Sequence, residues 1–295
     1  MVQEEAFRKN LLIVITLLFL GVVSFFSFKL YKRLQENKQQ KLIIEEQQKE
    51  MIASINYAKR IQFALLAHKE VLEKNLPEHF VLFKPKDIVS GDFYWATLKN
   101  EFFYLAICDC TGHGVPGAFM SLLNINYLNE AINEKGISEP GEILDHVRMQ
   151  LIKNLGGGRD GMDAVLLRLP VKRTEKMQVS YAAANNSGIV ISDGKIEELE
   201  KDSMPIGLGV REDKFRTFVK EVKKGDCLYL YTDGFADQFG GPKSKKFKYK
   251  QLDETLKLNS EENFQKQHDL LLSAFENWKG KLEQVDDVCV IGMQF

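Results

Sequence analysis

Cysteine is scarce in this sequence, and its spacing excludes the usual cysteine-based sites. Four cysteines occur among 295 residues, each in or beside an apolar, strand-like run: Cys108, Cys110, Cys227 and Cys289. So few cysteines do not form the framework of a small secreted protein, which favours a reducing compartment. The C-x-C pair lacks the longer spacer of a zinc site, and the sequence contains no C-x-x-C redox motif.

Net charge is nearly absent as well. The chain carries 40 Lys and Arg against 41 Asp and Glu, a formal net charge of −1. This balance gives no electrostatic case for a nucleic-acid partner, and it argues against a two-metal phosphodiesterase or nuclease. The glycine-rich stretch "GHGVPGAF" lacks the Lys-Ser/Thr of a P-loop, and no C-x5-R loop of a cysteine phosphatase is present.

One long segment carries no charge. Residues 11–28, "LLIVITLLFLGVVSFFSF", approach the ~20 apolar residues that cross a bilayer. A cleaved signal peptide is the alternative, but the run ends in bulky residues rather than at a small-residue cleavage site. Only Arg8 and Lys9 precede the segment, whereas five basic residues follow it: Lys29, Lys32, Arg33, Lys38 and Lys41. We expect a short tail (1–10), a single-pass helix in the inner (cytoplasmic) membrane, and a cytoplasmic C-terminal part.

Residues 29–76 are expected to form a helical linker. No glycine or proline occurs from Leu30 to Leu72, and Glu, Gln, Lys and Leu are abundant, which favours helix. Several positions follow heptad spacing: Ile44, Gln48, Met51, Ile55, Ala58, Gln62 and Leu65. Two interpretations stay open, a solvated spacer helix and a parallel coiled coil that makes the protein a homodimer.

Residues 77–295 are expected to form one α+β domain. Strands are predicted in "HFVLFKPKD", "DFYWATLKN" and "EFFYLAICD", with a turn at Lys99-Asn100. Helices are predicted from Pro116 to the end of "NEAINE", over 141–154 and over 260–280. Further strands are expected in "DVCVIGMQF" and near residues 163–171, 177–184, 188–192, 214–222 and 226–232. Because βαβ alternation is missing, a doubly wound sheet is excluded.

Aspartates occur at the ends of separate apolar strands, where this residue is otherwise uncommon. Asp92 follows "IVSG", Asp109 ends "EFFYLAIC", Asp233 follows "DCLYLYT", and Asp286 and Asp287 open the last strand. A single such residue is more often a turn or cap. Several aspartates that meet at one sheet edge would repel one another unless cations neutralised their charge. The pattern therefore favours a site for Mg²⁺ or Mn²⁺, which prefer oxygen ligands.

The alternation of side chains along a strand predicts that the cysteines do not take part in the metal site. Neighbours two apart in a strand face the same side. Cys108 and Cys110 are therefore expected to point into packing, while Asp109 points toward the site. Gly112 and Gly114, which follow, allow a sharp turn and a close backbone approach.

Six motifs occur in an order that carries a family resemblance: "SGDFYW", "CDCTGHGVPGAFMS", "YAAANNSGIVI", "PIGLG", "GDCLYLYTDGFADQF" and "QVDDVCVIG". Over residues 77–295 the chain resembles the stage II sporulation E-type phosphatases, a bacterial branch of the metal-dependent (PPM, type 2C) protein phosphatases. The resemblance implies an α-β-β-α sandwich with two Mn²⁺ or Mg²⁺ ions at one edge of the paired sheets. It also implies hydrolysis of phosphoserine or phosphothreonine on proteins, often on anti-sigma-factor antagonists.

The resemblance implies roles for individual residues. Asp109 matches the carboxylate that bridges the two metals, and Cys110 matches the neighbour that binds through its backbone carbonyl. Asp233 and Asp286 match ligands of the first metal, and Asp92 matches the acidic residue that binds a metal or holds its water. Second-tier candidates and glycines that would shape the backbone are Asp163, Asp287, Gly91, Gly112, Gly114 and Gly234. His113 is a candidate proton donor to the leaving oxygen, although a lone histidine is more often structural.

The sequence therefore predicts a membrane-anchored, metal-dependent protein serine/threonine phosphatase that acts in signal transduction. A hydroxide held between the two cations would attack phosphorus in line, without a phosphoenzyme. The alternative, from a different class, is a regulatory binding module that keeps the fold but has little activity. The run "KSKKFKYK" predicts either a solvated loop or a docking surface for an acidic or phosphorylated partner, through Lys243, Lys245, Lys246, Lys248 and Lys250.

Overall fold

The structure is a computed structural model that describes residues 2–295 except 68, 77, 157, 159, 173 and 212. The chain divides into two units, Met1–Ser54 and Ile55–Phe295. The predicted start of the domain, residue 77, lies outside the described residues. The second unit begins at Ile55, so the last part of the predicted linker packs with the domain.

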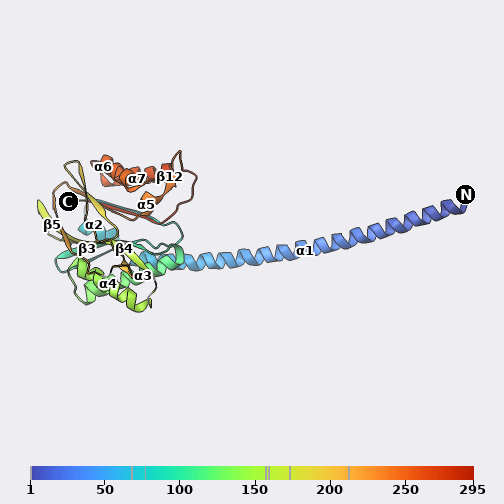
Figure 1. Cartoon of the computed structure of the whole chain (residues 1–295), viewed down its shortest axis with the longest axis horizontal. Helices are drawn as coiled ribbons and strands as arrows, with labels where there is room; N and C mark the ends of the chain where they lie inside the picture. Colours follow the sequence, from blue (N-terminus) through green and yellow to red (C-terminus); the bar gives the residue numbers. More distant parts are fainter. Residues whose placement is uncertain are drawn as a thin grey trace. The chain divides into compact units, whose positions relative to one another are not determined.

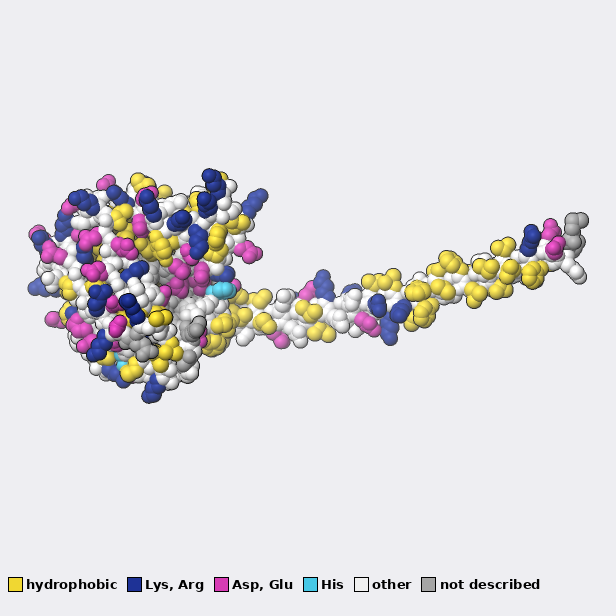
Figure 2. Space-filling view, viewed as in Figure 1, with side chains coloured by type: hydrophobic (Ala, Val, Ile, Leu, Met, Phe, Trp, Pro, Cys, Tyr) yellow, Lys and Arg dark blue, Asp and Glu magenta, His cyan; other side chains and the backbone are white. Residues whose placement is uncertain are grey.

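Helix α1 (Val2–Leu65) is continuous through the apolar segment and most of the predicted linker. Its sequence contains no proline and a single glycine, so nothing in it interrupts the backbone hydrogen bonds. Hydrophobic side chains cover the N-terminal part of the helix, and charged groups bound them (Figure 2). It is the one helix among the described residues that is long and apolar enough to cross a membrane, a property that signal sequences share.

The C-terminal turns of α1 belong to the second unit. Gln62 is buried, and its amide donates to the Ser90 carbonyl (2.6 Å) and the Ser121 hydroxyl (2.8 Å). Its side-chain oxygen accepts the Ser90 N–H at 3.1 Å. The prediction that Gln62 lies on a coiled-coil seam is therefore wrong, because a dimer seam needs an accessible side chain. A short helix, α2 (Lys69–Asn75), follows α1.

Two antiparallel sheets form the centre of the second unit. The first runs in the order β1 (His79–Lys84), β13 (Val288–Gln294), β10 (Cys227–Tyr231), β6 (Gly188–Ser192) and β7 (Lys195–Glu198). The second runs β2 (Phe93–Lys99), β3 (Phe102–Cys110), β4 (Gly161–Pro170), β5 (Lys176–Ala184) and β9 (Phe218–Lys223), with β8 (Ile206–Gly207) also paired to β4. A separate hairpin contains β11 (Phe239–Gly240) and β12 (Lys245–Lys246).

Helices cover the outer face of each sheet (Figure 1). On one side lie α3 (Gly114–Asn129), the π-helical turn η1 (Glu130–Glu134) and α4 (Pro140–Asn154). On the other lie α6 (Tyr249–Asn259) and α7 (Phe264–Lys279), while the short α5 (Gly234–Asp237) follows β10. The predicted α-β-β-α sandwich is confirmed.

Successive side chains of a strand point to opposite faces of the sheet, and this alternation fills the apolar layers on both sides. In β3, Tyr104, Ala106, Cys108 and Cys110 join the apolar cluster under α3 and α4. Phe103, Leu105 and Ile107 join the cluster between the two sheets. A third cluster lies between the first sheet and α6 and α7. Because Asp109 continues the second series, its side chain leaves the strand on the inter-sheet face, as the periodicity predicts.

Several elements differ from those predicted. The strand expected near 214–222 begins only at Phe218. The backbone N–H of Arg216 donates to the Asp202 carboxylate at 2.8 Å and not to a neighbouring strand, and the Arg216 Nε donates to the same carboxylate at 2.7 Å. The late helix begins at Phe264, after the Asn263 side chain accepts the Lys266 N–H. A separate helix, α6, precedes it and was not predicted; its buried Leu252 and Leu256 show helical spacing.

Candidate active site

Three of the predicted aspartates lie at one edge of the second sheet. Asp109, at the end of β3, pairs in register with Asp163 in β4. Asp92 immediately precedes β2, whose first residue pairs with Cys108. The antiparallel pairing therefore places the three side chains at neighbouring strand ends.

The first sheet contributes aspartates to the same region. Asp233 follows the end of β10, and Asp286 and Asp287 precede the antiparallel neighbour β13. The negative charges of Asp233 and Asp286 act on Asp109, so carboxylates from the two sheets lie close together. Acidic side chains gather in the middle of the visible face of the second unit (Figure 2).

Burial and mutual repulsion disfavour ionisation of this cluster. Burial, followed by the charges of Asp233 and Asp286, raises the pKa of Asp109 from 3.8 to about 8. The pKa of Asp233 rises to about 6 for the same reasons, and that of Asp92 rises well above its ordinary value. The side chains of Asp92 and Asp233 both lie close enough to Asp109 to influence its ionisation directly. Carboxyl groups this close keep protons unless other positive charge is supplied.

The donor set fits hard divalent cations. All the side chains concerned offer carboxylate oxygens, and the buried Oδ2 of Asp92 has no hydrogen-bond partner. A buried, unsatisfied carboxylate oxygen is costly unless a cation or donor reaches it. Within the described residues, no three His, Cys, Asp or Glu side chains are already arranged as a metal site. The fit therefore rests on the oxygen chemistry of the carboxylates and on their proximity to one another.

Asp287 has a different role from its neighbours. Its buried carboxylate accepts the backbone N–H of Lys86 at 2.7 Å and of Gly91 at 2.8 Å. Both oxygens are therefore engaged by the loop that precedes Asp92. The second-tier candidate Asp287 thus holds this loop in place. Asp163, the other second-tier residue, accepts the Asn185 amide at 3.0 Å, and burial raises its pKa.

Glycines permit close backbone approach around the carboxylates. Gly112 and Gly114 have positive φ angles of 86° and 64°. A Cβ on Gly91 would lie 2.3 Å from the Gly112 carbonyl oxygen, and one on Gly234 would lie 1.9 Å from that of Asp287. Larger residues at these two positions would displace the backbone next to Asp92 and Asp233.

The two cysteines beside Asp109 have structural positions. Cys108 and Cys110 are buried, and burial raises the pKa of both thiols well above the ordinary value. The Asn124 amide contacts the Cys110 sulfur at 3.4 Å. Neither thiol is therefore a nucleophile near neutral pH.

His113 is exposed and lies in a contact network of its own. Its Nδ1 is 2.8 Å from Asp87 Oδ2, and its Nε2 is 3.1 Å from Lys86 Nζ. In a neutral ring, Nδ1–H donates to Asp87 and Nε2 accepts from Lys86. The expected role of His113 as a proton donor gains no support from this arrangement, because neither nitrogen offers a free proton.

A pocket of about 340 Å³ opens beside the carboxylates, lined by Asp109, Asp163, Asn185, Asn186, Ser187, Glu198, Lys201, Tyr231, Asp233, Tyr249 and Asp253. Lys201 and Tyr249 were not among the predicted site residues, because neither belongs to any of the six motifs. The lysines of the predicted docking run are all exposed, and Lys246 pairs with Asp237 at 2.6 Å. Tyr249, which lines the pocket, is the first residue of α6 after this run.

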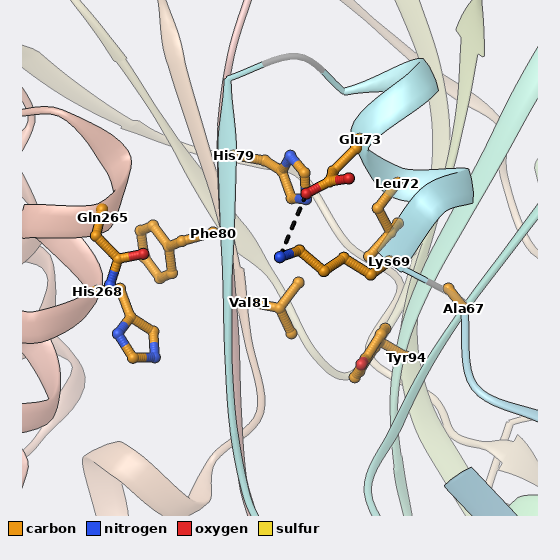
Figure 3. A pocket seen from close by; sticks show the side chains of 10 residues that line it. All are labelled: Ala67, Lys69, Leu72, Glu73, His79, Phe80, Val81, Tyr94, Gln265 and His268. Atoms are coloured by element: carbon orange, nitrogen blue, oxygen red, sulfur yellow. Dashed lines mark ion pairs between the residues drawn. The ribbon is translucent and has the colours of Figure 1, made fainter. Parts of the chain in front are cut away.

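A second pocket, of about 410 Å³, contains none of the predicted site residues. Figure 3 shows Gln265 and His268 reaching it from α7, opposite Lys69, Leu72 and Glu73 of α2. Lys69 pairs with Glu73 at 3.4 Å, and the floor includes Phe80, Val81 and Tyr94. The chemistry predicted from the sequence therefore belongs to the first pocket.

Comparisons with known proteins agree with this fold. A sequence model of the family Stage II sporulation protein E (SpoIIE) matches residues 100–295. The SiaA-PP2C domain of Pseudomonas aeruginosa is 31% identical, with a TM-score of 0.77, over 84% of this chain and 98% of that one. The PP2C phosphatase domain of SpoIIE from Bacillus subtilis, solved with a fragment of its regulatory domain, shares the fold, at 20% identity and a TM-score of 0.60, over 74% of this chain and 62% of that one.

A curated relative is also similar in sequence. Phosphoserine phosphatase RsbU of Bacillus subtilis (strain 168) is 26% identical over 193 residues, which are 64% of this chain. The match covers 55% of RsbU, so the chain spans about half the length of the curated relative that it matches.

Proposed function

Because the chain belongs to the stage II sporulation protein E family, we propose that it is a metal-dependent phosphatase of phosphoserine or phosphothreonine on a signalling protein. One observation carries this proposal: the buried cluster of Asp92, Asp109 and Asp233, in which ionisation is disfavoured. A cluster of this kind needs added positive charge to work near neutral pH, and it borders a pocket that can admit a phosphorylated side chain.

The residues that would hold two Mn²⁺ or Mg²⁺ ions are those that the family motifs assign. Asp109 would bind both ions, the Cys110 carbonyl would assist, and Asp92, Asp233 and Asp286 would complete the sites. Bound divalent cations supply Lewis acidity, which lowers the pKa of water enough for attack on phosphorus near neutral pH. The chain itself aligns the carboxylates on rigid strand ends and fixes the Asp92 loop through Asp287.

The proposed activity is tested with a phosphoserine peptide. We expect phosphate release from the peptide in Mn²⁺, and little hydrolysis of a phosphodiester such as bis-p-nitrophenyl phosphate. A regulatory binding module with the same fold is the second candidate. It would bind the peptide without releasing phosphate, and that result would exclude the enzyme.

Without cations, the raised pKa values of Asp109 and Asp233 make stability depend on pH. A carboxyl whose pKa is higher in the folded chain stabilises the fold at low pH, and this contribution is lost as pH rises through the folded value. We expect the cation-free protein to lose stability from about pH 4 to 8, because the two pKa values are about 6 and 8. Mn²⁺ at 100 times its Kd should raise Tm by roughly 5–10 °C, more at pH 8 than at pH 5. Thermal scans with EDTA and with Mn²⁺ measure this, and a larger shift at pH 5 would contradict it.

We also propose that residues 11–28 anchor the protein in the cytoplasmic membrane, with the second unit in the cytoplasm. The exposed apolar surface of this segment and the basic residues after it support the assignment. Recovery of the full chain in the soluble fraction of lysed cells, without detergent, would contradict it.

A parallel dimer through the linker is proposed as well. Ile44 and Met51 are exposed on α1 at heptad spacing, and burying such side chains stabilises a coiled coil. Ile44→Glu should weaken dimerisation of residues 30–295 by about tenfold or more. The matched control is Ile43→Glu, at an equally exposed position outside the heptad series. Sedimentation at micromolar concentration measures both, and a monomeric wild type would contradict the dimer.

A further inference from the structure

The pocket beside the carboxylates has an unusual charge balance. Five carboxylates line it, and Lys201 is the one cation among its described lining residues. A phosphate that enters this pocket meets strong negative charge on several sides. Cations bound by the aspartates would offset part of it, and a further positive group on the pocket wall would attract the phosphate.

The polar side chains around Lys201 are already engaged. The Asn185 amide donates to Asp163 at 3.0 Å, and the Asn186 amide donates to the Tyr231 carbonyl at 2.7 Å. The Ser187 hydroxyl donates to the Leu199 carbonyl, and the Tyr231 hydroxyl donates to Asp253. These four side chains therefore help to hold the wall together, and none of them carries a positive charge.

The backbone at Lys201 is fixed. Its carbonyl accepts from Arg216 Nη2 at 3.3 Å, and Arg216 Nε also donates to the Asp202 carboxylate at 2.7 Å. The Asp202 N–H donates to the Ala183 carbonyl, and the Asp202 carbonyl accepts the Asn185 N–H. Lys201 is thereby tied to the end of β5, next to the turn that contacts Asp163.

The ammonium group of Lys201 remains available. The side chain is exposed and forms no ion pair with any residue that the structure describes. Its charge nevertheless acts on Asp163, the partner of Asp109 across β3 and β4. A lysine with a fixed backbone, a long flexible stem and an unpaired ammonium suits phosphate binding as a point charge.

We propose that Lys201 is a substrate-binding residue whose ammonium donates hydrogen bonds to the phosphate of the phosphorylated side chain in this pocket. The inference rests on the proposed phosphatase function. It assigns phosphate recognition to a residue between β7 and β8, in the segment that pairs with the end of β5, outside the metal-ligand motifs. The chemistry recognised is a phosphate dianion on a serine or threonine side chain.

The test uses the full chain in detergent with saturating Mn²⁺. Lys201→Gln should raise KM for a phosphoserine peptide by roughly tenfold, the effect of losing one charged hydrogen bond. Its kcat should change little, and Lys201→Arg should recover most of the lost affinity. The matched control is Lys195→Gln, which removes the same charge from an exposed position in β7 that does not line the pocket.

A second readout does not depend on turnover. Inorganic phosphate should raise the Tm of the Mn²⁺-loaded wild type and of Lys195→Gln, and it should do so much less in Lys201→Gln. An active wild type whose KM and phosphate-dependent Tm shift match those of Lys201→Gln would overturn this inference alone. An inactive wild type would overturn the proposed function, and this inference with it.

Discussion

Asp109→Asn should reduce phosphate release by about a thousandfold or more in saturating Mn²⁺. The substitution keeps the size of the side chain but removes the charge at the centre of the cluster. Asp109 lies next to both Asp92 and Asp233, so it stands between the carboxylates of the two sheets. Without its charge, neither cation would be held in place.

The same substitution should not unfold the protein. Asp109 is repelled by Asp233 and Asp286, and a neutral amide relieves that repulsion. In EDTA at pH 8 the variant should therefore melt at or above the temperature of the wild type. Steady-state rates and thermal scans on one preparation separate lost catalysis from lost folding.

The control for this prediction is the next residue. Cys110→Ser changes a buried side chain but keeps the backbone carbonyl, which is the group assigned to the site. We expect its activity to stay within a few fold of the wild type. If Cys110→Ser were as inactive as Asp109→Asn, the chemistry could not be assigned to the aspartate alone.

Gly91→Ala should be strongly damaging although it leaves every charge in place. The added Cβ would lie 2.3 Å from the Gly112 carbonyl oxygen and 3.2 Å from that of Cys110. Both neighbours are backbone, so the loops that carry Asp92 and Gly112 must move apart. A shift of about 1 Å at a catalytic site can cost on the order of a hundredfold in rate, and we expect at least that loss.

Gly136→Ala provides the matched control. Gly136 has a positive φ of 68°, but a Cβ there meets nothing within 4 Å. The substitution should cost about 1–2 kcal/mol of stability through backbone strain and leave kcat unchanged. Equal rate losses in Gly91→Ala and Gly136→Ala would show that crowding against Gly112 does not shape the site.

The sequence predicted those parts of the fold and site that depend on local pattern. Period-two alternation placed Cys108 and Cys110 in the core and Asp109 on the opposite face, and the structure confirms this placement. The turn at Asn100 is confirmed by its positive φ of 55°. Strand-end aspartates are visible in a sequence because charge is rare beside apolar strands.

Other features depend on contacts between distant segments, which local pattern does not contain. Gln62 satisfied the heptad spacing, yet its amide binds Ser90 and Ser121 of the domain. Asp287 was a second-tier candidate in the sequence, and nothing there indicated that both its oxygens accept backbone N–H groups some 200 residues away. Lys201 belongs to no motif. It lines the pocket only because the next residue, Asp202, pairs with Ala184 at the end of β5.

The central claim is that the aspartate cluster works as a cation-dependent phosphatase site. The most direct measurement is phosphate release from a phosphoserine peptide by one preparation of the full chain, first treated with EDTA and then given Mn²⁺. We predict that EDTA stops release and that Mn²⁺ restores it in the wild type but not in Asp109→Asn. Release that continues unchanged in EDTA, or that Mn²⁺ restores equally in Asp109→Asn, would contradict the claim.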